Sequence, residues 1–117
     1  MRRSLRVVIA VSFLVTGAAA CTKGSASASC ANPTAATSVD LQDYAYAPAC
    51  TQAAAGATLT LHNSGSQPHS FTVQGTGVNI LVKPGTSAEA TLAGIAAGTY
   101  KVVCTIHPQM VGALKIG

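Results

Sequence analysis

The sequence is poor in charge and in large aromatic side chains. Its 117 residues include no tryptophan, two phenylalanines and three tyrosines, and only three side chains are acidic. Any core must therefore be mainly aliphatic, because aromatic side chains can fill little of it. No segment after residue 20 shows the apolar repeat of a long amphipathic helix, which argues against a helical fold.

The most apolar stretch, residues 7–15, is too short to cross a bilayer, which takes roughly 20 residues. Three arginines precede it and a run of small residues follows it, an order typical of a secretory signal peptide. Residues 1–20 are therefore predicted to be an export signal. Without them, four basic and three acidic side chains remain, which gives a net charge of +1. No basic cluster remains that would bind nucleic acid.

The end of this signal has two interpretations. Ala18, Ala19 and Ala20 fit an ordinary small-residue cleavage site. The same alanines followed by Cys21 resemble a bacterial lipobox, although that motif prefers leucine at the position of Ala18. A free, exposed thiol at the end of an exported chain would be reactive, which favours lipidation of Cys21. We expect a periplasmic or cell-surface protein tethered to the membrane by lipid, with a freely soluble form as the alternative.

The rest of the chain divides into a linker and one domain. Residues 21–36 are mostly small and polar, which is typical of a flexible tether. Residues 37–117 form the predicted domain, where apolar and polar residues alternate between turns rich in glycine. About seven to eight short strands predict an all-β sandwich or barrel. The alanine-rich residues 47–57 have the composition for a turn or two of helix, which Pro48 limits.

Four cysteines constrain the chemistry. If Cys21 carries lipid and Cys104 carries metal, Cys30 and Cys50 remain as a pair. An oxidising compartment would permit a disulfide between them, which would attach the N-terminal segment to the domain. Two unpaired, buried thiols are the alternative.

The segment after the penultimate predicted strand concentrates metal donors. Cys104, His107 and Met110 supply a thiolate, an imidazole and a thioether within seven residues. His69 begins another predicted strand, whose end a sandwich can bring beside this loop. Such a set suits copper in both oxidation states, whereas structural zinc would normally use paired cysteines and histidines and no methionine. With one thiolate in the loop, one mononuclear copper ion is predicted. His62, on the polar face of a strand, is predicted to be exposed.

These motifs resemble a cupredoxin of the plastocyanin/amicyanin type over residues 37–117. The loop CTIHPQM at residues 104–110 is similar to the short amicyanin spacing, and NSGSQPH at residues 63–69 is similar to the turn bearing the first histidine ligand. Residues 98–100 and Gly112 also match. The resemblance implies a Greek-key β-sandwich with one copper, Cu(I) or Cu(II), at one end.

The resemblance also implies how the site is used, and it shows one departure. Many members carry asparagine after the first histidine, where it ties the two ligand loops together, and this chain has Ser70. Electrons are expected to pass through the edge of His107, within a patch formed by Ile106, Pro108 and Gln109. Contact with redox partner proteins there should be small and transient.

The leading hypothesis is a single-electron carrier and not an enzyme, since four protein donors leave no position for substrate. The alternative is a copper storage or delivery protein, although such proteins use methionine- and histidine-rich tracts, which this chain lacks. A structural or adhesion role for a domain without metal is the third hypothesis. It leaves the presence of all four donors unexplained.

Overall fold

The computed structural model describes residues 30–117, and the described part contains strands and no helix. The ten strands are β1 (Thr34–Ala35), β2 (Ser38–Gln42), β3 (Ala45–Ala47), β4 (Cys50–Ala53), β5 (Thr58–Asn63), β6 (His69–Val73), β7 (Asn79–Val82), β8 (Ser87–Thr91), β9 (Gly98–Val103) and β10 (Val111–Ile116). The predicted all-β sandwich is confirmed. The number of strands exceeds the predicted seven to eight because short segments such as β1 and β3 also pair.

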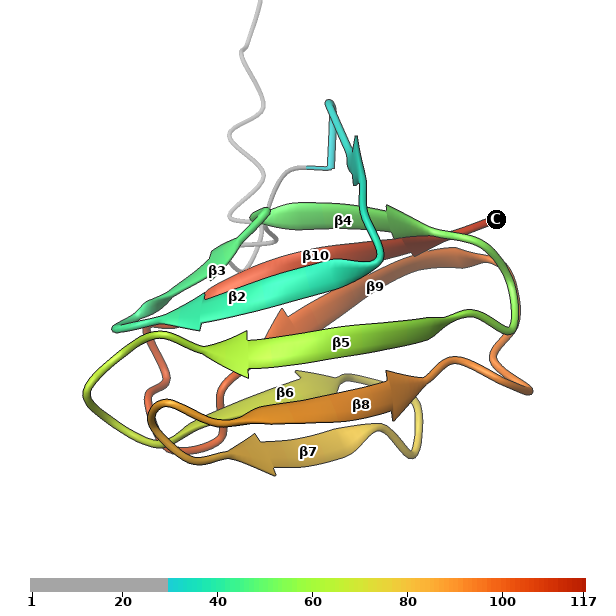
Figure 1. Ribbon diagram of the computed structural model, residues 1–117. Coiled ribbons are helices and arrows are strands. Elements are labelled where there is room, and N and C mark those ends of the chain that lie inside the picture. The colour runs from blue at the N-terminus through green and yellow to red at the C-terminus, as the bar shows by residue number, and fades with distance from the viewer. Residues whose placement is uncertain (1–29) are drawn as a thin grey trace, which may run out of the picture.

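The strands form two sheets that pack face to face (Figure 1). The larger sheet has the order β1-β4-β10-β9-β6-β7 and the smaller one β3-β2-β5-β8. Both sheets are mixed, since β4 runs parallel to β10 and β2 runs parallel to β5. The β2–β3 turn, the β5–β6 loop and the β9–β10 loop all lie at the left end of the molecule in Figure 1. The sandwich thus gathers three sequence-distant segments at one end.

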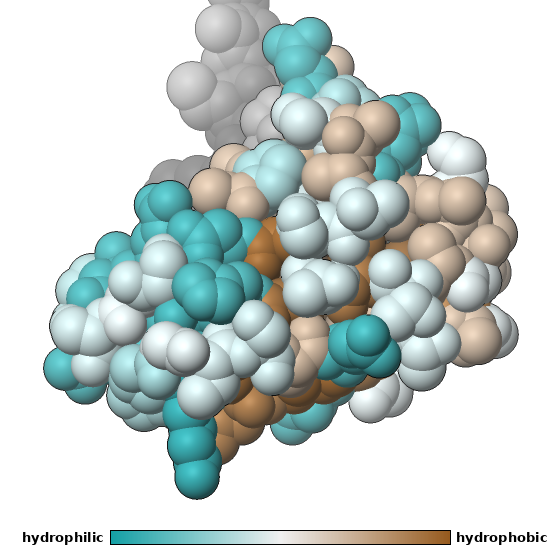
Figure 2. Space-filling model, viewed as in Figure 1, coloured by the Kyte–Doolittle hydropathy of each residue, from teal (hydrophilic) through white to brown (hydrophobic). Residues whose placement is uncertain are grey.

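The core between the sheets is aliphatic, as the scarcity of aromatic residues predicts. Strand β5 alternates exposed and buried positions along its whole length, as a half-buried strand must. The largest fully buried apolar side chains include Leu41, Leu59, Leu61, Leu92, Leu114 and Phe71. Figure 2 shows hydrophilic and neutral residues over most of this view, with apolar residues chiefly near its middle. The domain therefore depends on a compact aliphatic interior beneath a polar surface that carries little charge.

Ordered structure begins before residue 37, where the composition places the end of a linker. Strand β1 lies inside the predicted linker, residues 21–36, and pairs with β4. A disulfide also joins Cys30 of this segment to Cys50, with the two Cα atoms 5.4 Å apart. Pairing and the covalent link order a segment whose small polar residues could not build a core. The predicted signal, Cys21 and the linker up to residue 29 lie outside the described residues. No helix in the described part is long and apolar enough to span a membrane.

Gly112 is needed where the two sheets meet near the loop end. A Cβ atom on it would lie 2.8 Å from the Tyr46 ring and 3.1 Å from the Ala49 carbonyl oxygen. The Tyr46 ring packs edge-on against Phe71, and its hydroxyl donates a 2.6 Å hydrogen bond to the Ser70 carbonyl. Only glycine leaves room for this ring between the sheets.

We predict that Gly112→Ala lowers the free energy of unfolding by about 1–3 kcal/mol, because the added methyl group overpacks the Tyr46 contact. Urea denaturation of the metal-free protein measures the change. Gly77→Ala is the matched control, since no atom lies within 4 Å of a Cβ there. Equal losses in the two variants would contradict the packing argument.

Candidate metal centre

Three of the four predicted donors lie together at the loop end of the sandwich. His69 begins β6, and Cys104 and His107 lie in the loop after β9. One ligand atom from each residue lies within 4.8 Å of the other two. His69 and Cys104 are buried and His107 is partly exposed, so the group is closed toward the core and open toward solvent on one side.

The fourth predicted donor, Met110, closes the same loop. Its side chain is fully buried, and its backbone N–H donates to the His107 carbonyl at 2.9 Å. The Cys104 N–H in turn donates to the Met110 carbonyl at 3.2 Å. These two bonds fold the seven-residue segment into a compact turn and return the chain to β10.

The Cys104 thiol has surroundings that favour its thiolate form. Burial by itself would raise the pKa, but hydrogen bonds from backbone N–H groups and from the His107 ring outweigh it. Together they lower the pKa of Cys104 to about 6 from the usual 9.0. The Ser70 N–H donates to Sγ at 3.3 Å, and Sγ lies 3.7 Å from His107 Nδ1. A deprotonated sulfur is what a metal requires.

Ser70 ties the two ligand segments together. Its Oγ accepts hydrogen bonds from the Thr105 N–H at 2.9 Å and from the Thr105 hydroxyl at 3.3 Å. In the cupredoxin pattern that the sequence resembles, asparagine at this position ties the ligand loops together. Here the shorter serine side chain makes the link. Three Ser70 contacts, one through its backbone N–H and two through its Oγ, join β6 to the loop after β9.

One nitrogen of His69 is buried and has no partner. Nε2 lies 2.9 Å from Asp43 Oδ1, whereas Nδ1 is buried without a hydrogen bond. Unpartnered buried polar atoms are uncommon and call for an explanation, an ion among them. A metal ion would satisfy this nitrogen, so the surroundings of His69 fit a bound ion.

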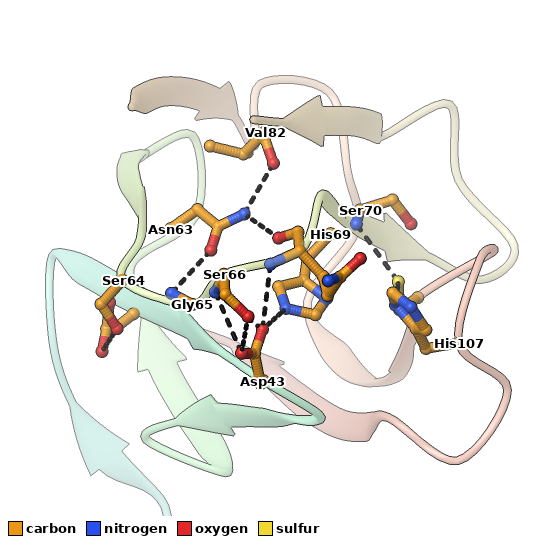
Figure 3. A network of polar contacts seen from close by, with 12 residues as sticks. Asp43, Asn63, Ser64, Gly65, Ser66, His69, Ser70, Val82 and His107 are labelled. Carbon is orange, nitrogen blue, oxygen red and sulfur yellow. Dashed lines mark hydrogen bonds and ion pairs between the residues drawn. The ribbon is translucent and has the colours of Figure 1, made fainter. Parts of the chain in front are cut away.

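The β5–β6 loop that leads to His69 is held by two side chains (Figure 3). Asn63 donates to the carbonyl groups of Gln67 and Val82, both at 2.8 Å, and accepts from the Gly65 N–H at 2.9 Å. Asp43 accepts from the Ser66 hydroxyl at 2.6 Å, from the Ser66 N–H at 3.0 Å and from the Gln67 N–H at 3.2 Å.

These bonds to Asp43 also act on its ionisation. The hydrogen bonds of Ser66 and His69 hold the pKa of the Asp43 carboxyl well below its usual value of 3.8. The residue is therefore a carboxylate at neutral pH, and its negative charge lies beside Nε2 of His69, one of the predicted metal donors.

Tyr44 covers the histidines from outside. Its ring centroid lies 5.1 Å from that of His107 and 6.2 Å from that of His69, in edge-on contacts. Its φ of 71° is in the left-handed region, which is uncommon for a bulky residue, and 48% of the residue is exposed. An unusual backbone conformation in the β2–β3 turn therefore accompanies a position beside both rings.

His62, predicted to be exposed, is exposed, and its Nδ1 lies 3.4 Å from Asp40 Oδ1. Sequence reasoning missed Asp43 and Tyr44, which belong to neither ligand segment. The one available signal was that Asp43 is among only three acidic residues in the chain. The scarcity of acidic residues does not indicate which residue Asp43 contacts, because only the fold brings the β2–β3 turn beside His69.

The chemistry of the donors fits copper. A thiolate and two imidazoles beside a thioether are soft and borderline ligands that suit Cu(I) and Cu(II), and they are not the paired set of structural zinc.

Comparison with known families agrees with this site. The family described as the cupredoxin-like domain matches residues 6–116, and the chain belongs to it. The predicted copper cofactor is confirmed at the level of the family and of the His–Cys–His group. Family and site together indicate copper-based electron transfer as the general activity.

Solved structures show the same fold. A purple cupredoxin from Nitrosopumilus maritimus is 23% identical with a TM-score of 0.58, over 70% of this chain and all of that one. An oxidised amicyanin mutant is 26% identical with a TM-score of 0.59, over 70% of this chain and 82% of that one. A Cu-containing nitrite reductase from Thermus scotoductus SA-01 is 19% identical with a TM-score of 0.59, over 69% of this chain and 22% of that one. Comparison with curated proteins gave no match.

We predict that Ser70→Ala weakens the link between the ligand segments, at a cost of about 1 kcal/mol in free energy of unfolding. The Thr105 amide should also exchange its hydrogen with solvent faster, because it loses its acceptor. Urea denaturation and NMR-detected exchange measure these two effects. Ser87→Ala, at an exposed strand position of the smaller sheet, should change neither. An unchanged Thr105 exchange rate in Ser70→Ala would contradict the prediction.

Proposed function

We propose that the protein is a single-electron carrier with one mononuclear copper ion bound by His69, Cys104, His107 and Met110. The observation that carries the proposal is the buried, unpartnered Nδ1 of His69 in a group where ligand atoms of His69, Cys104 and His107 lie within 4.8 Å of one another. A cation bound there would satisfy the His69 nitrogen and would contact the Cys104 sulfur. Copper, when bound, would accept one electron and release it again.

The surrounding chain favours fast electron transfer by holding the donors still. His69 is fixed by Asp43, and Cys104 is fixed by Ser70 and by the turn that ends at Met110. Donors held in this way would move little when the charge of the site changes, whatever the electronic origin of its geometry. A site filled by four protein donors also leaves no position for substrate, which favours a carrier over an enzyme.

The exposed side of the donor group supports electron exchange there. His107 is partly exposed, and Ile106 beside it is 47% exposed. Tyr44 extends the patch that the sequence predicts, and Pro108 and Gln109 complete it with exposed surface. Such a small, weakly charged surface suits brief contacts with a redox partner protein.

An exported, lipid-tethered setting completes the proposal. The N-terminal charge and apolar pattern support export, and the Cys30–Cys50 disulfide supports an oxidising compartment. Acylation at Cys21 would anchor the chain to a membrane and leave the copper domain in the periplasm or at the cell surface.

We predict that the protein, given one equivalent of Cu(II), becomes intensely blue or purple through charge transfer from the thiolate. Cys104→Ala should abolish the colour and His107→Ala should alter or abolish it. Absorption and electron paramagnetic resonance spectra measure the result. His62→Ala is the matched control, because it removes a histidine outside the donor group and should leave the spectrum unchanged. A colourless wild-type complex, or bound copper that cannot be reversibly reduced, would contradict electron transfer and favour storage or delivery.

We predict that the full chain, expressed in a bacterial host with labelled palmitate, incorporates label and partitions into detergent. Cys21→Ser should abolish both, because the acylated sulfur is lost. Cys104→Ser, which removes a different sulfur, should still be labelled. Unlabelled wild-type protein in the aqueous phase would exclude the tether and leave the copper proposal intact.

A further inference from the structure

Asp43 lies behind His69 although 26 residues separate them in the sequence. The carboxylate belongs to the β2–β3 turn, which contributes no metal donor. Figure 3 shows it between the His69 ring and the β5–β6 loop, with dashed lines to both. Its Oδ1 is 2.9 Å from His69 Nε2.

This contact determines which nitrogen of His69 is available. A carboxylate oxygen can only accept a hydrogen bond, so Nε2 must carry the ring hydrogen. In the neutral ring, Nδ1 then has the free lone pair, and Nδ1 is the buried atom without a partner. The bond at Nε2 therefore selects the tautomer that presents Nδ1 to a cation.

The loop is built around this carboxylate. Ser66 and Gln67 donate three further hydrogen bonds from the backbone and one from the Ser66 hydroxyl. A Cβ atom on Gly65 would overlap the Asp43 carboxylate, so glycine there leaves the space that Asp43 occupies. One side chain thus sets both the path of the loop and the direction of the His69 ring.

We propose that Asp43 is a positioning residue of the metal site, which fixes the tautomer of His69 and lowers the reduction potential. The second effect follows from charge: a carboxylate hydrogen-bonded to a ligand makes that ligand more basic and stabilises Cu(II) more than Cu(I). The inference rests on the proposed copper site, and its test separates the two.

The chain offers a close control. The side chain of Asp40 is 33% exposed, as is that of Asp43. Asp40 also contacts the β5–β6 loop, because the hydroxyl of Ser64, at the start of that loop, donates to it at 2.7 Å. The histidine partner of Asp40, however, is the exposed His62. Asp40→Asn thus removes an equal charge from the same region without touching a donor.

The first measurement is the reduction potential of the copper-loaded protein by redox titration. Asp43→Asn keeps an oxygen that can accept from Nε2 and removes the charge. A tenfold loss of Cu(II) affinity relative to Cu(I) would raise the potential by about 59 mV. Asp43→Ala should weaken Cu(II) binding by roughly 10- to 100-fold. Asp40→Asn should change affinity less than about twofold, because solvent screens a charge that touches no ligand.

The second measurement needs no metal. Long-range ¹H–¹⁵N spectra of the metal-free protein at about pH 8 should show the Nε2–H tautomer of His69 in the wild type and a mixture of tautomers in Asp43→Ala. Asp43→Asn should retain the wild-type tautomer. Ser66→Ala, which removes one bond between Asp43 and the loop, should also retain it.

The outcomes separate the hypotheses. Equal shifts of potential in Asp43→Asn and Asp40→Asn would overturn the local role of Asp43. A Ser66→Ala variant that reproduces every effect of Asp43→Ala would reduce Asp43 to a support for the loop and overturn the proposal. A wild-type chain that binds no copper would overturn the proposed function, whereas the tautomer in the metal-free protein would still test Asp43 by itself.

Discussion

Ser70 holds together the two segments that carry the predicted metal donors. Its N–H donates to the Cys104 sulfur and its Oγ accepts from the Thr105 N–H, while its carbonyl accepts from the Tyr46 hydroxyl. The first two bonds join β6 to the loop after β9, and the third joins both to β3 in the opposite sheet. The site therefore depends on one residue whose backbone and side-chain groups are used together. Gly112 is needed for the third of these bonds, because the absence of a side chain leaves room for the Tyr46 ring.

How far the sequence predicts this structure depends on how local the signal is. The alternation of apolar and polar residues correctly predicts strands, as in β5, where exposed and buried positions alternate along the whole strand. The candidate metal donors stand out in the sequence because three of them lie within seven residues. Strand β4 was not predicted, because its alanine-rich surroundings carry no period of two. It forms because it pairs in parallel with β10, and that partner lies about 60 residues away in the chain, which a local pattern does not reveal.

The β2–β3 turn is the clearest case of a part that local sequence cannot reveal. It lies next to both histidines only because β2 pairs with β5 and the two sheets pack with their loops at the same end. Its two residues act in different ways: Asp43 contacts a ring nitrogen of His69, and Tyr44 packs its ring edge-on against His107. The positive φ of Tyr44 is a conformation that the turn retains despite its cost, which is common at functional sites. A third loop, which supplies no predicted donor, therefore contacts the candidate metal centre.

The scarcity of charge makes the use of acidic residues informative. Of the three in the whole chain, Asp40 and Asp43 both accept hydrogen bonds from the β5–β6 loop, one at Ser64 and the other at Ser66. A chain selected for solubility alone would distribute such charges over its surface. Here two of them stabilise the path into His69, and only Asp43 also contacts the ligand ring. Asp40 and Asn63 also hydrogen-bond the loop, so the contact with the His69 ring is what distinguishes Asp43 from them. Within the described part of the chain, Asp43 is therefore the acidic residue whose charge lies in direct contact with a predicted metal donor.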